Sequence, residues 1–166
     1  MAGVLVDNPA TGETVTDQEP LSPEQVPALL ARAEETARAW KASSVAERIK
    51  LCDAFLRRFE TDRDRIAREI TLQMGKPLSE AHAELRTMER RARFMMDAAV
   101  GQLEDHLVAE EVGTRRFIER VPVGVVLDIA AWNYPLLIAI NVVVPALLAG
   151  NAVILSAEDG AEDTIV

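Results

Sequence analysis

Apolar residues recur every three or four positions through the first hundred residues, which is the spacing of one face of an α-helix. Ser, Thr or Asp residues stand at the starts of these segments, where they cap helices, and Gly residues follow two of their ends. In the first segment, Pro27 is expected to delay the helix by a turn. The sequence therefore predicts four helices, with the expected limits Ser22 to Lys41, Ser44 to Phe59, Thr61 or Asp62 to Gly75, and Pro77 to Gly101.

The apolar faces of these helices are expected to form the core. Six positions of the longest helix step by four and three, namely Ala81, Leu85, Met88, Ala92, Met95 and Ala99. The first two helices are expected to bury Leu30, Ala33, Ala37, Trp40, Ile49, Cys52, Phe55, Leu56 and Phe59. Because Cys52 lies on such a stripe, we interpret it as a core thiol rather than a catalytic nucleophile.

The pattern changes after residue 113. Residues 114–122 alternate apolar and charged side chains, which predicts an exposed or edge strand. Residues 124–130 form a nearly continuous apolar run, typical of a parallel strand buried on both faces. A helix over 134–149 and a second buried strand over 152–155 complete a β–α–β unit. The expected fold class is α/β: N-terminal helices followed by the first β–α–β unit of a Rossmann-like parallel sheet.

Residues 130–155 contain no charged side chain and are long enough to cross a bilayer. Pro and Gly residues within the stretch fall where they delimit shorter elements. Asn133, Asn141 and Asn151 lie inside it, and no Lys or Arg flanks it to set an orientation. We therefore favour the buried β–α–β interpretation over a membrane span.

Composition narrows the function classes. The 166 residues carry a formal net charge of −9, which disfavours a nucleic-acid partner because phosphate binding needs clustered Lys and Arg. Cys52 is the only cysteine, so an internal disulfide is excluded, which is compatible with a cytoplasmic location. The N-terminus lacks the pattern of a secretory signal, and His82 and His106 show no metal-ligand spacing. No metal site is expected.

Several motifs occur in one order along the chain. They are Asn8-Pro9-Ala10-Thr11-Gly12-Glu13, then Gln73-Met74-Gly75-Lys76-Pro77-Leu78-Ser79-Glu80-Ala81, then Val121-Pro122-Val123-Gly124-Val125-Val126, then Trp132-Asn133-Tyr134-Pro135, and finally the segment from Pro145 to Val153. Together these motifs resemble the NAD(P)-dependent aldehyde dehydrogenase superfamily over residues 7–155. Members oxidise aldehydes to carboxylic acids through a thiohemiacetal, with hydride transfer to NAD(P)+.

The resemblance implies a site at the end of the first parallel strand. Asn133 takes the place of the family's oxyanion-hole asparagine, whose amide N–H stabilises the oxygen that becomes negative on thiolate attack. Asn133 also suits a helix N-cap, and one amide can serve both roles. The four residues that resemble the strand end lining the nicotinamide cofactor are Ile129, Ala130, Ala131 and Trp132. The resemblance thus implies NAD or NADP as the cofactor of the intact family, whereas binding by this fragment alone is not expected, because the family's Lys and Gly-rich turn are missing.

The chain departs from the family after the second strand. Ser156 stands where the family has a Lys that holds the adenosine ribose, and Asp159 is the candidate for the neighbouring Glu, with a shorter reach. The family's nucleophilic Cys, general-base Glu and Gly-rich cofactor turn have no counterpart here, so the resemblance is to an N-terminal fragment. We divide the chain into an N-terminal helical part (1–113), an oligomerisation-type strand arm (114–122) and the start of a cofactor-binding sheet (123–166), with the catalytic domain absent. The pairing partner of the strand arm is expected from the absent part.

Two functions are compatible with these features. The first is an aldehyde dehydrogenase-family polypeptide that is inactive alone because it lacks the nucleophile. The second is a non-catalytic interaction module that associates with itself or with full-length aldehyde dehydrogenase subunits by strand addition. An aldehyde is expected as substrate only in the intact family, and neither nucleic acid nor a membrane is an expected partner.

Overall fold

A computed structural model describes residues 3–157 and 164–165 of the chain. The helices are α1 (Val26–Lys41), α2 (Val45–Thr61), α3 (Arg63–Met74), α4 (Leu78–Gln102) and α5 (Pro135–Leu148). The strands are β1 (Val4–Asp7), β2 (Thr14–Gln18), β3 (His106–Glu111), β4 (Thr114–Ile118), β5 (Val125–Ala130), β6 (Ala152–Ala157) and β7 (Thr164–Ile165).

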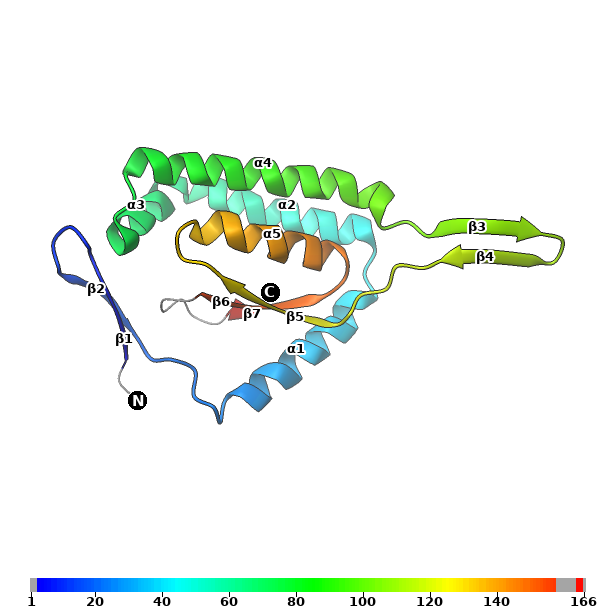
Figure 1. The fold of residues 1–166 in the computed structure, drawn as a ribbon, viewed down its shortest axis with the longest axis horizontal. Coiled ribbons are helices and arrows are strands. Elements are labelled where there is room, and N and C mark those ends of the chain that lie inside the picture. The colour runs from blue at the N-terminus through cyan, green and yellow to red at the C-terminus, as the bar shows by residue number, and fades with distance from the viewer. Residues whose placement is uncertain (1–2, 158–163, 166) are drawn as a thin grey trace.

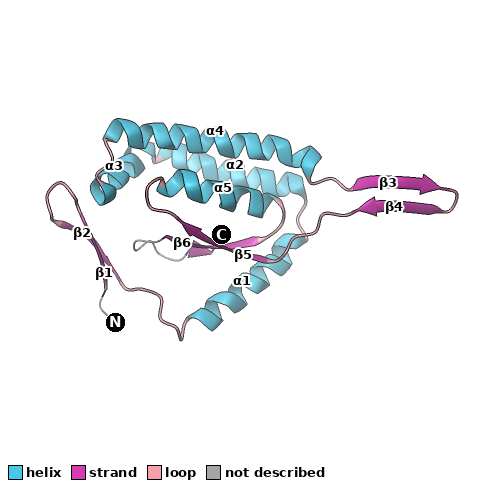
Figure 2. Cartoon of the chain, viewed as in Figure 1, coloured by secondary structure: helices cyan, strands magenta, loops and turns pink. Residues whose placement is uncertain are grey.

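The centre of the molecule is a small sheet with the order β5-β6-β7, in which β5 and β6 are parallel and β7 is antiparallel to β6. Helix α5 connects β5 to β6 and lies with α2 and α4 on one side of the sheet, while α1 lies on the other side (Figure 1). Strands β3 and β4 form an antiparallel hairpin that projects from this body, and β1 and β2 form a second antiparallel hairpin whose tip lies beside the end of α3 (Figure 2). The expected α/β class and the parallel β–α–β unit are confirmed.

The helix starts follow from local sequence. Helix α1 begins at Val26 with Pro27 in its first turn, so the expected delay is confirmed. The predicted capping box also forms: Ser44 Oγ accepts from the Glu47 amide, and the Glu47 carboxylate accepts from the Ser44 amide at 2.7 Å. Helix α4 runs through Gly101 to Gln102, slightly beyond the expected end.

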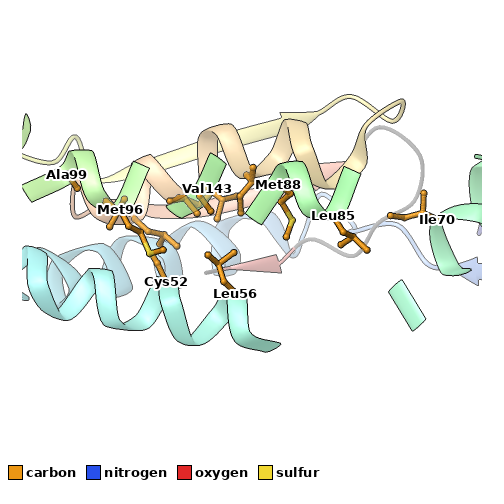
Figure 3. Packing of buried hydrophobic residues seen from close by; sticks show 14 of the residues in the cluster. Cys52, Leu56, Ile70, Leu85, Met88, Met96, Ala99 and Val143 are labelled. Carbon is orange, nitrogen blue, oxygen red and sulfur yellow. The ribbon is translucent and has the colours of Figure 1, made fainter. Parts of the chain in front are cut away.

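Helices α2, α4 and α5 share one apolar core (Figure 3). Every expected α4 position except one is buried: Met96 takes the buried place, and Met95 is only partly buried. The expectation for α1 was wrong at Leu30, which is 46% exposed, because α1 covers only part of the sheet and turns the Ala33 and Ala37 side toward it. Small residues on α1 allow this close approach of helix and sheet.

The prediction that β5 is buried on both faces was wrong. Val126 packs against the helical core, but Leu127 and Ile129 on the opposite face are 60% and 61% exposed. On that face α1 covers β6, where Ile154 is 5% exposed, and among the described residues no element covers β5 to the same extent. The apolar run thus forms a strand that the described residues cover well on one face only.

The strand predicted at 114–122 forms over Thr114–Ile118 as β4. One of its edges pairs within this chain, which the sequence pattern did not predict, and a partner from the absent part stays a prediction for the other edge. Strand β4 pairs with β3 of the same chain through the turn at Val112 and Gly113, where Gly113 has φ 81°. A hairpin turn of this kind needs positive φ, which glycine adopts without strain. The arm is thus a complete two-stranded ribbon that begins at His106, and it projects from the body (Figure 1).

Candidate functional site

The parallel register brings the expected cofactor-binding residues together. Ile129 of β5 lies opposite Ser156 of β6, and Ala130 opposite Ala157, at the carboxyl ends of both strands. Ala131 and Trp132 follow directly in the turn toward α5. Ligands of open α/β sheets bind at this edge, so the placement suits a binding site. Asp159 lies outside the described residues.

The edge combines apolar surface with a few polar groups. Ile129 and Trp132 are 61% and 57% exposed, whereas Ala130 beneath them is buried. Asn133 is exposed, and Ser156 is half-buried beside Ile129. Apolar side chains with a small number of placed polar groups are typical of cofactor sites.

Asn133 is not the N-cap of α5, so that alternative was wrong. The cap residue is Tyr134, which has φ −138° and makes no side-chain capping bond. Pro135 occupies the first helical position, where a missing N–H costs nothing. In the described part of the chain, no hydrogen bond engages the Asn133 side-chain amide, which leaves it free to donate to a ligand.

The cap of α5 comes instead from Glu84 of α4. Its Oε1 atom accepts from the amides of Leu136 and Leu137 at 3.0 and 3.1 Å, and its side chain is fully buried. Its Oε2 atom pairs with the ammonium of Lys76, which also donates to the Asn133 carbonyl at 3.0 Å. A carboxylate at a helix N-terminus is stabilised by the amides and by the helix dipole.

Sequence reasoning missed Glu84 and assigned Lys76 only to a motif. The sequence signal was weak, because Glu84 is one of many acids on an amphipathic helix. Its distinguishing feature is its position on the buried stripe of α4, one residue before Leu85. A charged residue at such a position needs a partner, and this requirement was the available clue.

The capping arrangement limits how a dinucleotide binds. Helix N-termini after parallel strands often hold the phosphates of nucleotides through free amides. Here the Leu136 and Leu137 amides are already bonded to a carboxylate, which would also repel an anion. The start of α5 therefore does not suit the pyrophosphate of a dinucleotide.

Cys52 lies in the core rather than at this edge (Figure 3). Its side chain is buried, and this burial raises the pKa of the thiol to about 11. The thiol is therefore protonated at neutral pH and inaccessible, which confirms the interpretation of Cys52 as a core residue. Within residues 3–157 and 164–165, no group of three potential metal ligands occurs.

The fold and the edge define an α/β protein in which helices pack on a parallel β–α–β unit with an exposed carboxyl edge. The chain belongs to the aldehyde dehydrogenase family, whose model matches residues 3–164. The resemblance drawn from the motifs is confirmed.

Known proteins support this assignment. The NADP(+) succinate-semialdehyde dehydrogenase of Mycobacterium avium strain 104 is 39% identical over 151 residues, which cover 89% of this chain and 32% of that protein. Among solved structures, the NADP-dependent glyceraldehyde-3-phosphate dehydrogenase of Bacillus halodurans C-125, complexed with NADP, is 28% identical, with a TM-score of 0.84. The match covers 92% of this chain and 33% of that chain. An aldehyde dehydrogenase of Brucella melitensis biovar abortus 2308 is 27% identical, with a TM-score of 0.86 over 92% of this chain and 32% of that chain.

The chain thus spans about a third of the length of these relatives. In the part of the chain that the structure describes, no helix has the length and apolar character needed to cross a bilayer.

Proposed function

We propose that this chain supplies the nicotinamide-side edge and the oxyanion-hole amide of an NAD(P)-dependent aldehyde dehydrogenase. The observation that carries the proposal is the adjacency of Ile129 and Ser156 at the ends of two parallel strands, with Asn133 in the turn that follows. The NADP-dependent relatives support the choice of cofactor. The lone free thiol agrees with a reducing compartment, and we place the protein in the cytoplasm.

Each residue has a defined role in this proposal. When bound, NAD(P)+ accepts the hydride that leaves the aldehyde carbon. Ile129 and Trp132 shield the reacting groups from water through their exposed apolar surfaces. The Asn133 amide donates to the oxygen that becomes negative during attack on the aldehyde, and Ser156 donates to a ribose hydroxyl. A serine makes a neutral hydrogen bond where a lysine would make a charged one, so the ribose contact is weaker.

We further propose that these 166 residues do not oxidise aldehydes alone. Covalent catalysis needs an accessible thiolate, and the only thiol of the chain is the buried, protonated Cys52. We therefore expect the purified chain to bind the nucleotide but not to oxidise aldehydes.

The test uses a Trp40→Phe chain, in which Trp132 is the only remaining indole. Titration with NADP+ and with NAD+ is expected to quench Trp132 fluorescence saturably, while a Trp40→Phe/Trp132→Phe chain reports no change. Aldehyde oxidation is followed in parallel by NADPH absorbance. Absence of saturable quenching and of binding heat at millimolar nucleotide contradicts the binding proposal. Turnover that Cys52→Ala abolishes contradicts the assignment of Cys52.

A second candidate function is an interaction module that docks on aldehyde dehydrogenase subunits. The observation that favours it is the position of β5 at an edge of its sheet, with Leu127 and Ile129 exposed beside that edge. Strand addition at such an edge uses main-chain hydrogen bonds and apolar contacts. Co-purification with a full-length subunit, lost on substituting Leu127→Lys, supports this function, and its absence with every subunit of the host removes it.

A further inference from the structure

We propose that Lys76 and Glu84 are positioning residues that hold the Trp132–Tyr134 turn and thereby the main chain of Asn133. The inference deepens the proposed function, because Asn133 is the amide that we assign to the oxyanion hole. Neither residue belongs to the edge itself, and both act through the turn.

The Glu84 carboxylate joins three groups from two distant parts of the chain. Two are the Leu136 and Leu137 amides, at 3.0 and 3.1 Å, and the third is the Lys76 ammonium. The Glu84 side chain is fully buried, and that of Lys76 is 10% exposed. A buried pair in which the remaining donors and acceptors are satisfied is geometrically restrictive, because any displacement leaves a charge unpaired.

Lys76 then connects this pair to the turn. Its ammonium donates to the Asn133 carbonyl at 3.0 Å and lies 4.0 Å from the centroid of the Tyr134 ring. The cation thus contacts two consecutive residues, one through the main chain and one through an aromatic face. Because Tyr134 supplies no side-chain cap, these contacts and the Glu84 cap replace the local bonds that usually order a helix start.

The physical role that follows is preorganisation. An amide that stabilises a developing negative charge must already be in place, since reorganisation during the reaction reduces its effect. The turn is exposed at Trp132 and Asn133, so solvent does not hold it in one conformation. The Lys76–Glu84 pair supplies that order from the buried side.

The test measures the time-resolved fluorescence anisotropy of Trp132 in the full Trp40→Phe chain. Lys76→Met and Glu84→Ala are expected to increase the amplitude of fast local motion at least about twofold, since the turn loses its anchors. Lys76→Arg is expected to keep the local motion of Trp132 close to that of the parent chain, because it retains the positive charge that pairs with Glu84. The matched control is Glu89→Gln, which removes a carboxylate of the same helix that pairs with Arg63 and Arg93 and not with the turn.

A chemical rescue separates loss of the anchor from general damage. In Glu84→Ala, sodium acetate supplies a carboxylate for the two freed amides and Lys76, so it is expected to restore the Trp132 anisotropy, whereas sodium chloride of equal ionic strength is not. Acetate is expected to leave the Trp132 anisotropy of Lys76→Met unchanged. If Glu84→Ala does not fold, Lys76→Met and Lys76→Arg decide the matter.

Unchanged Trp132 motion in folded Lys76→Met overturns the proposal, as does an equal increase in Glu89→Gln. The proposed function is judged separately by NADP+ affinity of the Trp40→Phe parent. A parent that binds no nucleotide refutes the proposed function, while the anisotropy series still decides whether Lys76 and Glu84 hold the turn.

Discussion

Individual residues decide several properties of this chain, and buried polar groups are the clearest cases. Asp128 is 5% exposed on the helix-facing side of β5, and its Oδ2 atom has no hydrogen-bond partner among the described residues. Burial raises the pKa of this carboxyl. The folded state therefore holds the proton more tightly than the unfolded chain, and this group lowers stability as the pH rises past the ordinary value of 3.8.

Replacing Asp128 tests this loss of stability. Asp128→Val is expected to raise the free energy of unfolding at pH 7 by about 1 kcal/mol or more, since it removes a buried acceptor without a partner. The gain is expected to shrink as the pH falls, because the raised pKa lets the folded state bind the proton at a higher pH than the unfolded chain does. Urea unfolding at several pH values measures it. The control is Asp17→Val, at an exposed position of β2, and it is expected to change the free energy of unfolding by less than about 0.5 kcal/mol. A loss of stability in Asp128→Val would show that the Asp128 carboxylate is hydrogen-bonded in the folded state.

Gly150 is a second residue on which packing depends. It has φ 91°, and an added Cβ atom would lie 2.8 Å from the guanidinium carbon of buried Arg48. Arg48 donates to the carbonyls of Leu148, Lys41 and Ser43, so it connects the end of α5 to the α1–α2 junction and has little room to move.

Gly150→Ala is expected to cost about 1–3 kcal/mol of unfolding free energy through backbone strain and displacement of Arg48. Its matched control is Gly101→Ala, since Gly101 lies inside α4 with open space around its Cβ position. That substitution is expected to stabilise the chain by about 0.5–1 kcal/mol. Equal effects of both substitutions on the denaturation midpoint would contradict this account.

At the scale of elements, the helices differ in where their caps come from. Helix α2 carries its own capping box within four consecutive residues, Ser44 to Glu47. Helix α5 has no local cap and depends on Glu84, which lies more than fifty residues earlier. Helix α2 therefore begins where its sequence dictates, while the start of α5 depends on the packing of α4.

Removal of the local cap gives a prediction for α2. Ser44→Ala is expected to lower the free energy of unfolding by about 1 kcal/mol, because the Glu47 amide loses its acceptor. Thermal unfolding followed by circular dichroism measures the effect. Ser79→Ala in the first turn of α4 is the comparison, since Ser79 is exposed and is not the cap. If both substitutions have the same small effect, the capping box contributes nothing measurable.

At the scale of the whole molecule, β5 exposes one apolar face at a sheet edge in the part of the chain that the structure describes. Leu127 and Ile129 are exposed next to a strand edge, and β3–β4 projects as a separate ribbon (Figure 1). Exposed apolar strands at sheet edges favour association. The 166-residue chain by itself is therefore expected to self-associate.

Sedimentation velocity over a range of concentrations tests this expectation. The double substitution Leu127→Lys/Ile129→Lys is expected to shift the chain toward monomer, since two charges oppose burial of that face. Val100→Lys on α4 is the control, because Val100 is 57% exposed but lies away from the sheet. A wild-type chain that stays monomeric at every concentration would show that the exposed face does not drive association.

The amino-acid sequence by itself determined the helices, the β–α–β unit and the family, because periodicity, caps and ordered motifs are local properties of the chain. It also indicated that Cys52 is a core residue, since its helical stripe is local as well. Only the tertiary structure decided that one face of β5 is free, that β3 pairs with β4, and that Glu84 caps α5 and holds Lys76 against the turn at Asn133. These features depend on which segments meet in space, and side-chain periodicity within one segment carries no information about its partner.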